Sequence, residues 1–299
     1  MTTPPAELVS IIIPTYGRPE HLTCAIDSVL TQTYKEIEIV VVDDNPPGST
    51  GRTNTEKLLG KYSNNERIKL IKHNNNKGGA LARNTGVHAS SGDLITFLDD
   101  DDTYHPEKIE KQVMHMKAGD LSVSLCASTI VVHDKISGTY DCQPRGTCLK
   151  EFLLFGAAVT PMIMLRRTLF MEVDGFEDTP RFQDHVFMIK IHERNATCGI
   201  LPLKLYTQNI HSGARVSYSP KSRLGYEIKH KFEARNFSVL SEKEIDRVIF
   251  RQSIALLGFT TQEKGLMAGL NEIFKLLPKV REVRQAWAWL KTLVKIFMK

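Results

Sequence analysis

The first hundred residues alternate between short strand-like runs and helical patterns, and this order constrains the fold more than any other feature. The strand-like runs are Val9–Pro14, Ile37–Val42, Ile68–Lys72 and Leu94–Leu98. Most of them are continuous and apolar, as expected of strands that are buried on both faces. Because helical patterns separate them, the sequence predicts βαβ units with right-handed crossovers and an α/β fold with a mostly parallel central sheet.

Polar loops follow three of these predicted strands. They are residues 15–18 (TYGR), 43–48 (DDNPPG) and 99–102 (DDDD). Ligands of open α/β sheets bind beyond the carboxyl ends of the strands. Since parallel strands carry those ends to one edge of the sheet, we expect the three loops to converge on one active site.

Four successive aspartates, Asp99 to Asp102, follow the fourth predicted strand. Adjacent like charges repel each other, and aspartate is a poor strand former. A hard divalent cation, Mg²⁺ or Mn²⁺, would relieve the repulsion and keep coordination places for substrate phosphates. Such an ion would stabilise a leaving diphosphate as a Lewis acid. The alternative is an acidic loop in which Asp102 or Thr103 caps the next helix.

Composition narrows the class of protein. A chain of 299 residues with 41% hydrophobic residues suits one large α/β domain with a tail, or two small domains. None of the five cysteines forms a C-x-x-C pair, so a zinc site or a disulfide framework is poorly supported. The net charge of +5 fits an anionic small molecule, an anionic membrane surface or no charged partner, and nucleic-acid binding is weakly supported. Without a visible signal peptide or membrane span, we expect a cytoplasmic protein.

Four segments together resemble the family 2 glycosyltransferases. VSIIIPTYGRPEHL is similar to that family's opening strand and donor loop, and EIVVVDDN to its second strand. NNNKGGALARNTGV is similar to its N-x-G-x-x-x-A-R-N-x-G segment, and LITFLDDDDTYHPEKIEKQ to its metal-site segment. The resemblance runs from about Leu8 to Ser219. It implies a GT-A (Rossmann-like) fold and an inverting transfer of a sugar from a nucleotide sugar, with UDP the commonest nucleotide, to a hydroxyl group.

The resemblance also implies roles for individual residues. The predicted nucleotide-sugar-binding residues are Pro14, Thr15, Tyr16, Arg18, Asp44, Lys77, Arg83, Asp99, Asp100 and Arg215. Asp44 would accept a hydrogen bond from the base, and the alternative is an aspartate that forms a turn. The basic residues would bind the diphosphate through charge-assisted hydrogen bonds, whereas Arg83 could instead be a helix-surface residue paired with a carboxylate.

The predicted metal ligands are Asp101 and His211, and the alternative for His211 is a structural or exposed histidine. The four-aspartate run leaves the roles of Asp99 and Asp100 open by one residue.

An inverting displacement needs a base to take the proton of the acceptor hydroxyl. Residues 173–177 (VDGFE) and 181–187 (RFQDHVF) resemble the family's Gly-Gly-Phe-like segment and the acidic pair that begins the following helix. Gln183 replaces the first acid of that pair, and Asp184 keeps the second, so we predict Asp184 as the catalytic base. Asp184 could instead be an acid favoured by the helix N-terminus, which would lower its pKa. The fallback candidates are Asp174, Glu177 and Asp178.

We expect residues 1–222 to form the catalytic domain and residues 223–299 a helical extension. Within the catalytic domain, the nucleotide-sugar half covers about residues 8–120 and the acceptor half about residues 121–222. The last helix, QAWAWLKTLVKIFMK, mixes basic and aromatic residues, which suits a membrane interface. Its alternative is packing on the catalytic domain or on a second subunit of a homo-oligomer.

The expected partners are therefore a nucleotide-sugar donor and a glycan or lipid-linked saccharide acceptor, with no nucleic acid. Membrane contact would place the protein peripherally at the cytoplasmic face of an inner membrane, in bacterial surface-polysaccharide assembly. Two other functions stay open. A sugar nucleotidyltransferase needs a Gly-rich phosphate loop after the first strand, where this chain has PTYGR instead. A non-catalytic nucleotide-sugar-binding relative does not need both Asp101 and Asp184.

Overall fold

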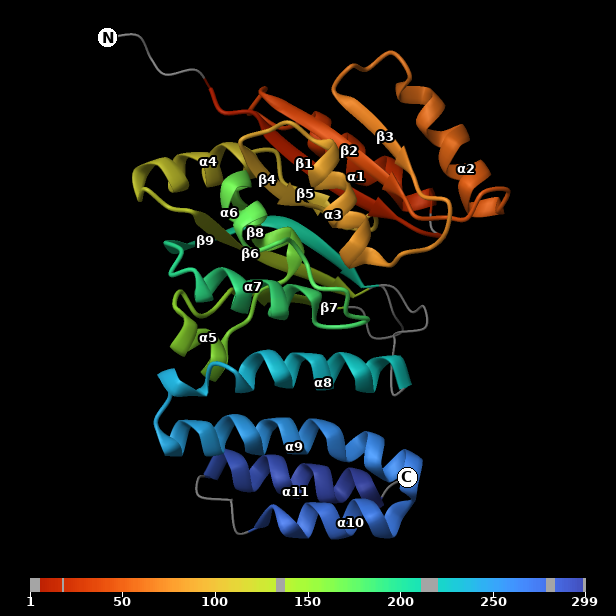
Figure 1. The fold of residues 1–299 in the computed structure, drawn as a ribbon. Helices are drawn as coiled ribbons and strands as arrows, with labels where there is room; N and C mark the ends of the chain where they lie inside the picture. Colours follow the sequence, from red (N-terminus) through yellow and green to blue (C-terminus); the bar gives the residue numbers. More distant parts are fainter. Residues whose placement is uncertain (1–5, 18, 133–137, 211–219, 278–282, 298–299) are drawn as a thin grey trace. The chain divides into compact units, whose positions relative to one another are not determined.

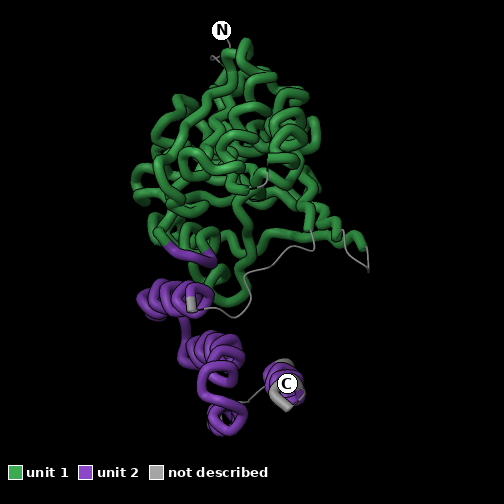
Figure 2. The backbone as a smooth tube through the Cα atoms, turned by 90° about the vertical axis from the view of Figure 1, so that its right-hand side faces the viewer, with its two compact units in different colours: residues 1–178, 183–213 green, residues 179–182, 214–299 purple. Residues whose placement is uncertain are grey.

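The computed structural model describes residues 6–17, 19–132, 138–210, 220–277 and 283–297. The chain divides into two compact units (Figure 2). Unit 1 consists of residues 1–178 and 183–213, and unit 2 of residues 179–182 and 214–299. The sheet and the predicted site residues that the structure describes belong to unit 1, whereas the described part of unit 2 after residue 182 is helical.

The four predicted strands form the parallel part of the sheet in unit 1. They are β1 (Val9–Thr15), β2 (Ile37–Asp43), β3 (Ile68–Lys72) and β4 (Leu94–Phe97), paired in the order β3-β2-β1-β4 (Figure 1). The helices between them are α1 (Pro19–Leu30), α2 (Thr50–Leu59) with the 3₁₀ turn η1 (Gly60–Tyr62), and α3 (Gly79–Ala89). The register pairs Thr15 with Asp43, so the ends of β1 and β2 lie side by side.

Helices α1 and α3 cover opposite faces of this parallel part, because successive strand residues point to opposite sides. Ile11 and Ile13 of β1 pack in one core with Ile26 of α1. The neighbouring Ile12 points toward α3, where a Cβ atom on Gly86 would lie 2.4 Å from the Ile12 side chain. Gly86 therefore lets α3 approach the sheet closely. Burial of each such large aliphatic side chain contributes about 1.5–3 kcal/mol.

The strands after β4 add antiparallel pairs, so the whole sheet is mixed. These strands are β5 (Thr103–Tyr104), β6 (Val123–Val132), β7 (Gly138–Cys142), β8 (Ile163–Arg166) and β9 (Cys198–Ile210). The order continues from β4 through β8, β6 and β9 to β5, and β7 pairs with β6. β8 runs antiparallel to both β4 and β6, whereas β6 and β9 are parallel. The predicted α/β sheet with flanking helices is confirmed. Its parallel part is formed by the first hundred residues, where strand-like and helical patterns alternate in the sequence.

The remaining helical elements of unit 1 are α4 (Lys108–Ala118), α5 (Leu149–Phe155), η2 (Thr160–Met162), α6 (Arg167–Glu172) and α7 (Gln183–Glu193). Helix α4 begins two residues after Pro106. Helix α7 follows the VDGFE segment and has Asp184 in its first turn.

Unit 2 contains α8 (Pro220–Ala234), η3 (Phe237–Val239), α9 (Glu242–Lys264), α10 (Leu266–Lys275) and α11 (Val283–Phe297). A capping box of Ser241 and Glu244 begins α9. Gly265, at a φ of +86°, ends α9 and begins α10, a conformation that favours glycine. Helices α9 and α10 pack around Leu257 and Ile273, among other buried apolar residues. Within the described residues, none of the helices has the length and apolarity needed to cross a membrane.

Candidate active site

The three polar loops meet at Thr15, the last residue of β1. The Thr15 hydroxyl donates to Oδ2 of Asp100 over 2.8 Å, and the Thr15 carbonyl accepts from the Asp44 amide over 3.0 Å. One residue therefore joins the loops after β1, β2 and β4. Pro14 is partly buried, whereas Tyr16 is 54% exposed at the start of its loop. An exposed aromatic ring beside this junction can stack on a planar ligand.

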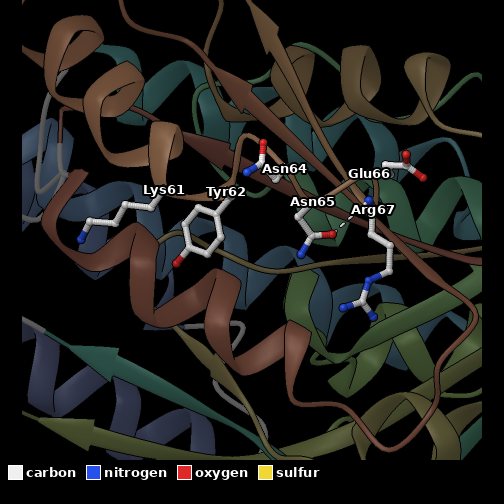
Figure 3. Close-up of a pocket in the computed structure, with 6 residues that line it drawn as sticks. All are labelled: Lys61, Tyr62, Asn64, Asn65, Glu66 and Arg67. Carbon is white, nitrogen blue, oxygen red and sulfur yellow. Dashed lines mark hydrogen bonds between the residues drawn. The ribbon is translucent and has the colours of Figure 1, made fainter.

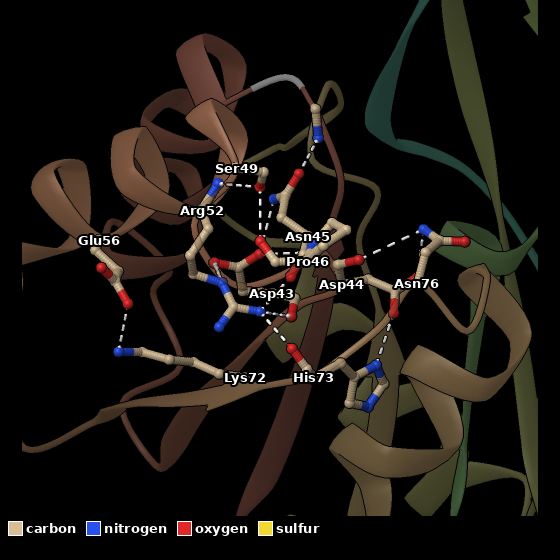
Figure 4. A network of polar contacts seen from close by, with 11 residues as sticks. Asp43, Asp44, Asn45, Pro46, Ser49, Arg52, Glu56, Lys72, His73 and Asn76 are labelled. Carbon is tan, nitrogen blue, oxygen red and sulfur yellow. Dashed lines mark hydrogen bonds and ion pairs between the residues drawn. The ribbon is translucent and has the colours of Figure 1, made fainter.

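Asp43, the first acid of the pair at the end of β2, stabilises the fold. The Asp43 carboxylate and the Arg52 guanidinium of α2 form a buried ion pair, with Nε and Oδ2 2.8 Å apart (Figure 4). Asp43 also accepts from the amide and the side chain of Asn45. The same guanidinium donates to the carbonyl oxygens of Asp43, Asn45 and His73, so it ties the loop after β2 to the end of β3.

Asp44 accepts four hydrogen bonds from the loop between β3 and α3. Its Oδ1 accepts from His73 Nδ1 at 2.7 Å and from the Lys77 amide at 2.9 Å. Its Oδ2 accepts from Asn76 Nδ2 at 3.0 Å and from the Gly78 amide at 2.8 Å. A carboxylate offers about four lone-pair directions. A nucleotide base would thus have to share or displace one of these donors to reach Asp44. The Lys77 side chain is exposed.

The four aspartates after β4 alternate in exposure. Asp100 and Asp102 are buried, and Asp99 and Asp101 keep part of their surface exposed. Asp102 accepts from the Asn209 amide of β9 over 2.9 Å. Burial raises the pKa of Asp102 well above its usual range, and the negative charge of Asp99 raises it further. The loop is therefore crowded with like charge, which a bound cation would relieve.

Arg83 of α3 connects the acidic loop to the helix that begins with Gln183. Its guanidinium forms an ion pair with Asp99 and donates from Nη1 to Gln183 Oε1 over 2.9 Å. Arg83 is 8% exposed, so it is not a helix-surface residue. A Cβ atom on Gly79 would lie 3.0 Å from the Arg83 guanidinium, and glycine therefore leaves room for this connection.

Asp184 lies next to this connection. Its Oδ1 accepts from the His185 amide over 2.7 Å. Burial raises the pKa of Asp184 to about 6, although the His185 amide and the charge of Arg83 act in the opposite direction. The prediction that the helix N-terminus would lower this pKa is wrong, because loss of solvent around the carboxylate outweighs the helix dipole. A pKa near 6 suits a general base that must be ionised yet accept a proton near neutral pH.

The model of the family "Glycosyl transferase family 2" matches residues 10–172, more than half of the chain. The chain belongs to glycosyl transferase family 2. An uncharacterized glycosyltransferase of Haemophilus influenzae is 28% identical over 189 residues, which are 62% of each chain. One from Rickettsia felis is 32% identical over 195 residues, 64% of this chain and 31% of that protein.

A third relative of this family 2 chain carries a more detailed name. It is the Escherichia coli UDP-Glc:alpha-D-GlcNAc-diphosphoundecaprenol beta-1,3-glucosyltransferase WfgD, 36% identical over 162 residues, which are 54% of this chain and 62% of WfgD. The chain thus spans less than two thirds of the length of each of these three relatives.

Solved structures share the fold of this family 2 chain. S. aureus TarS 1-349 in complex with UDP-GlcNAc has a TM-score of 0.64 at 21% identity, and the alignment covers 97% of this chain and 80% of that one. A complex of TarS 1-349 with UDP has a TM-score of 0.63 at 20% identity, covering 97% of this chain and 89% of that one. At such identities the likeness concerns the fold alone, and it confirms the predicted GT-A fold with a helical C-terminal part.

Sequence reasoning gave no role to two asparagines that hold the site of this family 2 protein together. Asn84 exchanges two hydrogen bonds of 2.8 Å with the backbone of Phe176, which ties α3 to the VDGFE segment. Asn209 donates from its side chain to the Asp101 carbonyl over 2.9 Å and thereby fixes the acidic loop to β9. The A-R-N triplet signalled Asn84 through its motif, whereas no local pattern marked Asn209.

The donor set of the acidic loop fits a divalent cation that a substrate helps to bind. Mg²⁺ and related ions bind through one or two carboxylates together with substrate phosphates. Asp99 and Asp101 supply partly exposed carboxylates. Within the described ranges, no group of three or more His, Cys, Asp or Glu residues could hold a metal without such help. Three predicted site residues, Arg18, His211 and Arg215, lie outside the described residues.

A surface hollow elsewhere in unit 1 is separate from this site. It is lined by Lys61, Tyr62 and residues 64–67, where the Arg67 amide donates to Asn65 (Figure 3). The segment leads into the first residue of β3. The hollow therefore lies at the amino end of a parallel strand, opposite to the edge where the polar loops meet.

Proposed function

We propose that this family 2 protein transfers one sugar, with inversion, from a UDP-sugar to a hydroxyl of a glycan or lipid-linked acceptor. The observation that carries the proposal is the link from Asp99 through Arg83 to Gln183, beside the carboxylate of Asp184. It joins an acidic loop suited to a metal-bound diphosphate with a carboxylate suited to proton transfer. A binding protein without catalysis would not need a partly buried carboxylate with a pKa near 6.

In the proposed reaction, Asp184 removes the proton of the acceptor hydroxyl. The hydroxyl oxygen then forms a bond to the anomeric carbon while the bond from that carbon to the UDP oxygen breaks. Mg²⁺ or Mn²⁺ at Asp101, with Asp99 next to it, would neutralise charge on the leaving diphosphate. Thr15 and Tyr16 would line the nucleoside pocket, and Lys77 would contact the nucleotide through its exposed ammonium group.

The proposed role of Asp44 is to position the nucleotide-binding loop. Its carboxylate binds the amides of Lys77 and Gly78. It thereby holds Lys77 and the start of α3, which carries Arg83, close to the end of β2. This arrangement would preserve the nucleoside pocket even if the base does not contact Asp44 directly.

The named relatives support the donor and acceptor classes. The name of WfgD specifies a UDP-sugar donor and an acceptor on diphosphoundecaprenol. TarS has been solved with UDP-GlcNAc and with UDP. For the present chain we propose the same classes, a UDP-sugar and a lipid-linked saccharide, and a lipid-linked acceptor would bring the protein to a membrane surface.

The proposal is tested by release of nucleoside diphosphate from a panel of nucleotide sugars with Mn²⁺, with and without EDTA. We expect release from a UDP-sugar that EDTA abolishes. Asp184→Asn should lower the rate by about 10²- to 10⁴-fold without weakening UDP-sugar binding. Asp178→Asn is the matched control, because Asp178 is an exposed acid near the same segment. Release of pyrophosphate would instead indicate a nucleotidyltransferase, and tight binding without turnover a binding protein.

The same variant separates catalysis from stability. The fold raises the pKa of Asp184, so stability from this group is present at low pH and is lost as the pH rises through about 6. At pH 8, Asp184→Asn should therefore have a free energy of unfolding about 1–3 kcal/mol higher than that of the wild type. Urea denaturation measures this difference. The wild-type rate should rise about tenfold per pH unit below 6 and level off above it. If Asp184→Asn were inactive and also less stable than the wild type, the assignment of Asp184 as the catalytic base would be contradicted.

A further inference from the structure

The positive charge of the chain is concentrated in its last helices. Residues 264–299 contain eight Lys and Arg residues and two Glu residues, a net charge of +6. The whole chain carries +5, so the remaining residues together are close to neutral. The segment contains helices α10 and α11 of unit 2, and four of its eight basic residues, Lys275, Arg284, Lys291 and Lys295, lie in these helices.

Helix α11 presents one tryptophan to its partner helices and one to solvent. The indole of Trp289 donates to the Ile273 carbonyl of α10 over 2.7 Å, and it packs against the small core of unit 2. Trp287 is 59% exposed, and Leu290 and Val294 are also exposed. Positions i, i+3 and i+7 share one face of a helix. The outer face of α11 is therefore an apolar row.

Apolar side chains of the α10 segment are exposed as well. Met267 is 77% exposed, and Phe274 and Leu277, the latter lying two residues beyond the end of α10, are about half exposed. The Phe274 ring packs edge-on against the indole of Trp289, with centroids 5.8 Å apart, so Phe274 borders the contact between α10 and α11. Ile273 is buried in the core that α10 shares with α11. The row on the outer face of α11 is therefore the apolar row that lies away from this contact.

We propose that the row on the outer face of α11, Trp287, Leu290 and Val294, adsorbs to an anionic lipid membrane. Single exposed apolar residues are ordinary, whereas three on one face of a helix form a surface suited to an apolar partner. An amphipathic helix with basic residues and tryptophan lies in the interface plane and does not span the bilayer. The surface belongs to unit 2 and does not depend on the proposed sugar transfer.

The net charge of residues 264–299 favours a membrane over a second copy of the chain as the partner of this surface. Two copies that meet through this surface would bring two segments of net charge +6 together, and like charges disfavour that contact. An anionic lipid surface attracts the same charge. Lys291, exposed on α11 between Leu290 and Val294, places one such charge next to the apolar row.

The two tryptophans of the chain provide the test, because both lie in α11. In the full-length Trp289→Phe variant, emission comes from Trp287 alone. We expect its emission to shift to the blue with vesicles of phosphatidylglycerol and phosphatidylethanolamine, and to stay unchanged with phosphatidylcholine. In Trp287→Phe, the inward Trp289 should respond weakly. Wild-type protein should sediment with the anionic vesicles, and its partition coefficient should fall at least tenfold when NaCl rises from about 0.05 to about 0.5 M.

A matched pair of variants shows whether the apolar row of α11 is responsible. Trp287→Ser combined with Val294→Ser should weaken vesicle binding at least tenfold, whereas Tyr140→Ser should not, although Tyr140 is 58% exposed in unit 1. Equal binding to neutral vesicles, or no binding at low salt, would overturn the proposal. A blue shift of Trp287 that follows protein concentration without lipid, together with a doubled mass in sedimentation, would identify a dimer surface instead. Transfer to a soluble acceptor should be unchanged in both variants.

Discussion

The acidic pair at the end of β2 and the acidic run after β4 lie at the ends of the two strands that flank β1, yet their surroundings differ. The carboxylates of Asp43 and Asp44 are buried among donors of the chain itself, including a guanidinium, an imidazole and backbone amides. In the run from Asp99 to Asp102, carboxylates adjoin one another, and burial together with the charge of the neighbouring aspartates raises the pKa of Asp102. The carboxylates after β2 are balanced by donors of the chain itself, whereas a bound cation would reduce the repulsion between the carboxylates after β4.

This difference shows how acidic residues of similar sequence context can be sorted. A carboxylate with all its lone pairs occupied by the chain is part of the scaffold, and its loss leaves buried donors unsatisfied. A carboxylate among other carboxylates stores repulsion that a ligand can relieve. We expect the largest effect for a substitution in the scaffold pair.

Asp43→Asn should break the buried ion pair with Arg52. Removing one partner of such a pair leaves an uncompensated charge and costs about 3–5 kcal/mol of unfolding free energy. Urea denaturation followed by circular dichroism measures this loss. Asp101→Asn is the control in the other loop and should change the unfolding free energy by less than about 1 kcal/mol. Equal losses in the two variants would remove the distinction between the loops.

Mn²⁺ with UDP should stabilise the wild type and not Asp101→Asn. A ligand at about 100 times its Kd stabilises the folded state by about 2.7 kcal/mol. Thermal unfolding with and without Mn²⁺, UDP and EDTA measures the effect, which EDTA should reverse. Asp43→Asn, examined at a temperature where it is folded, should still respond to the ligands. A cation effect that persists in Asp101→Asn would place the ion elsewhere.

Arg83→Gln should move the pH dependence of the reaction upward. The charge of Arg83 lowers the pKa of Asp184, so its removal should raise the midpoint of the rate profile from about 6 by up to about one unit. The rate at pH 5.5 should then fall more than the rate at pH 8. Arg194→Gln provides a control. Arg194 follows the end of α7, and its guanidinium donates to the Glu172 carbonyl instead of an acidic side chain of the site. A uniform loss at every pH would indicate that Arg83 only binds the donor.

Asn209→Ala should have the smallest effect. It removes one side-chain hydrogen bond to the Asp101 carbonyl, worth about 1 kcal/mol, and leaves the backbone bond to Asp102 in place. We expect the free energy of unfolding to fall by a similar amount. The dependence of UDP-sugar turnover on Mn²⁺, measured by titration, should be several-fold weaker. An unchanged Mn²⁺ titration would show that β9 does not position the acidic loop.

The sequence by itself determined the elements of the parallel part of the sheet and the loops at its ends. The alternation of strand-like and helical patterns is local, so β1 to β4 and α1 to α3 could be predicted with small shifts at their ends. The antiparallel pairing of β8 with β4 and β6 joins residues far apart in the chain, and no period in the sequence encodes it. Asp184 could be located by its motif, because the motif spans a few residues.

Only the tertiary structure decided what surrounds each charged side chain. Thr15 contacts Asp100 across 85 positions of sequence, Arg83 contacts Gln183 across 100, and Asn209 contacts Asp101 across 108. These contacts, and not the residue types, set which aspartates are buried and why the pKa of Asp184 rises. Desolvation and Coulomb interactions depend on distance in space, and a linear pattern carries that distance only for neighbours along a strand or helix.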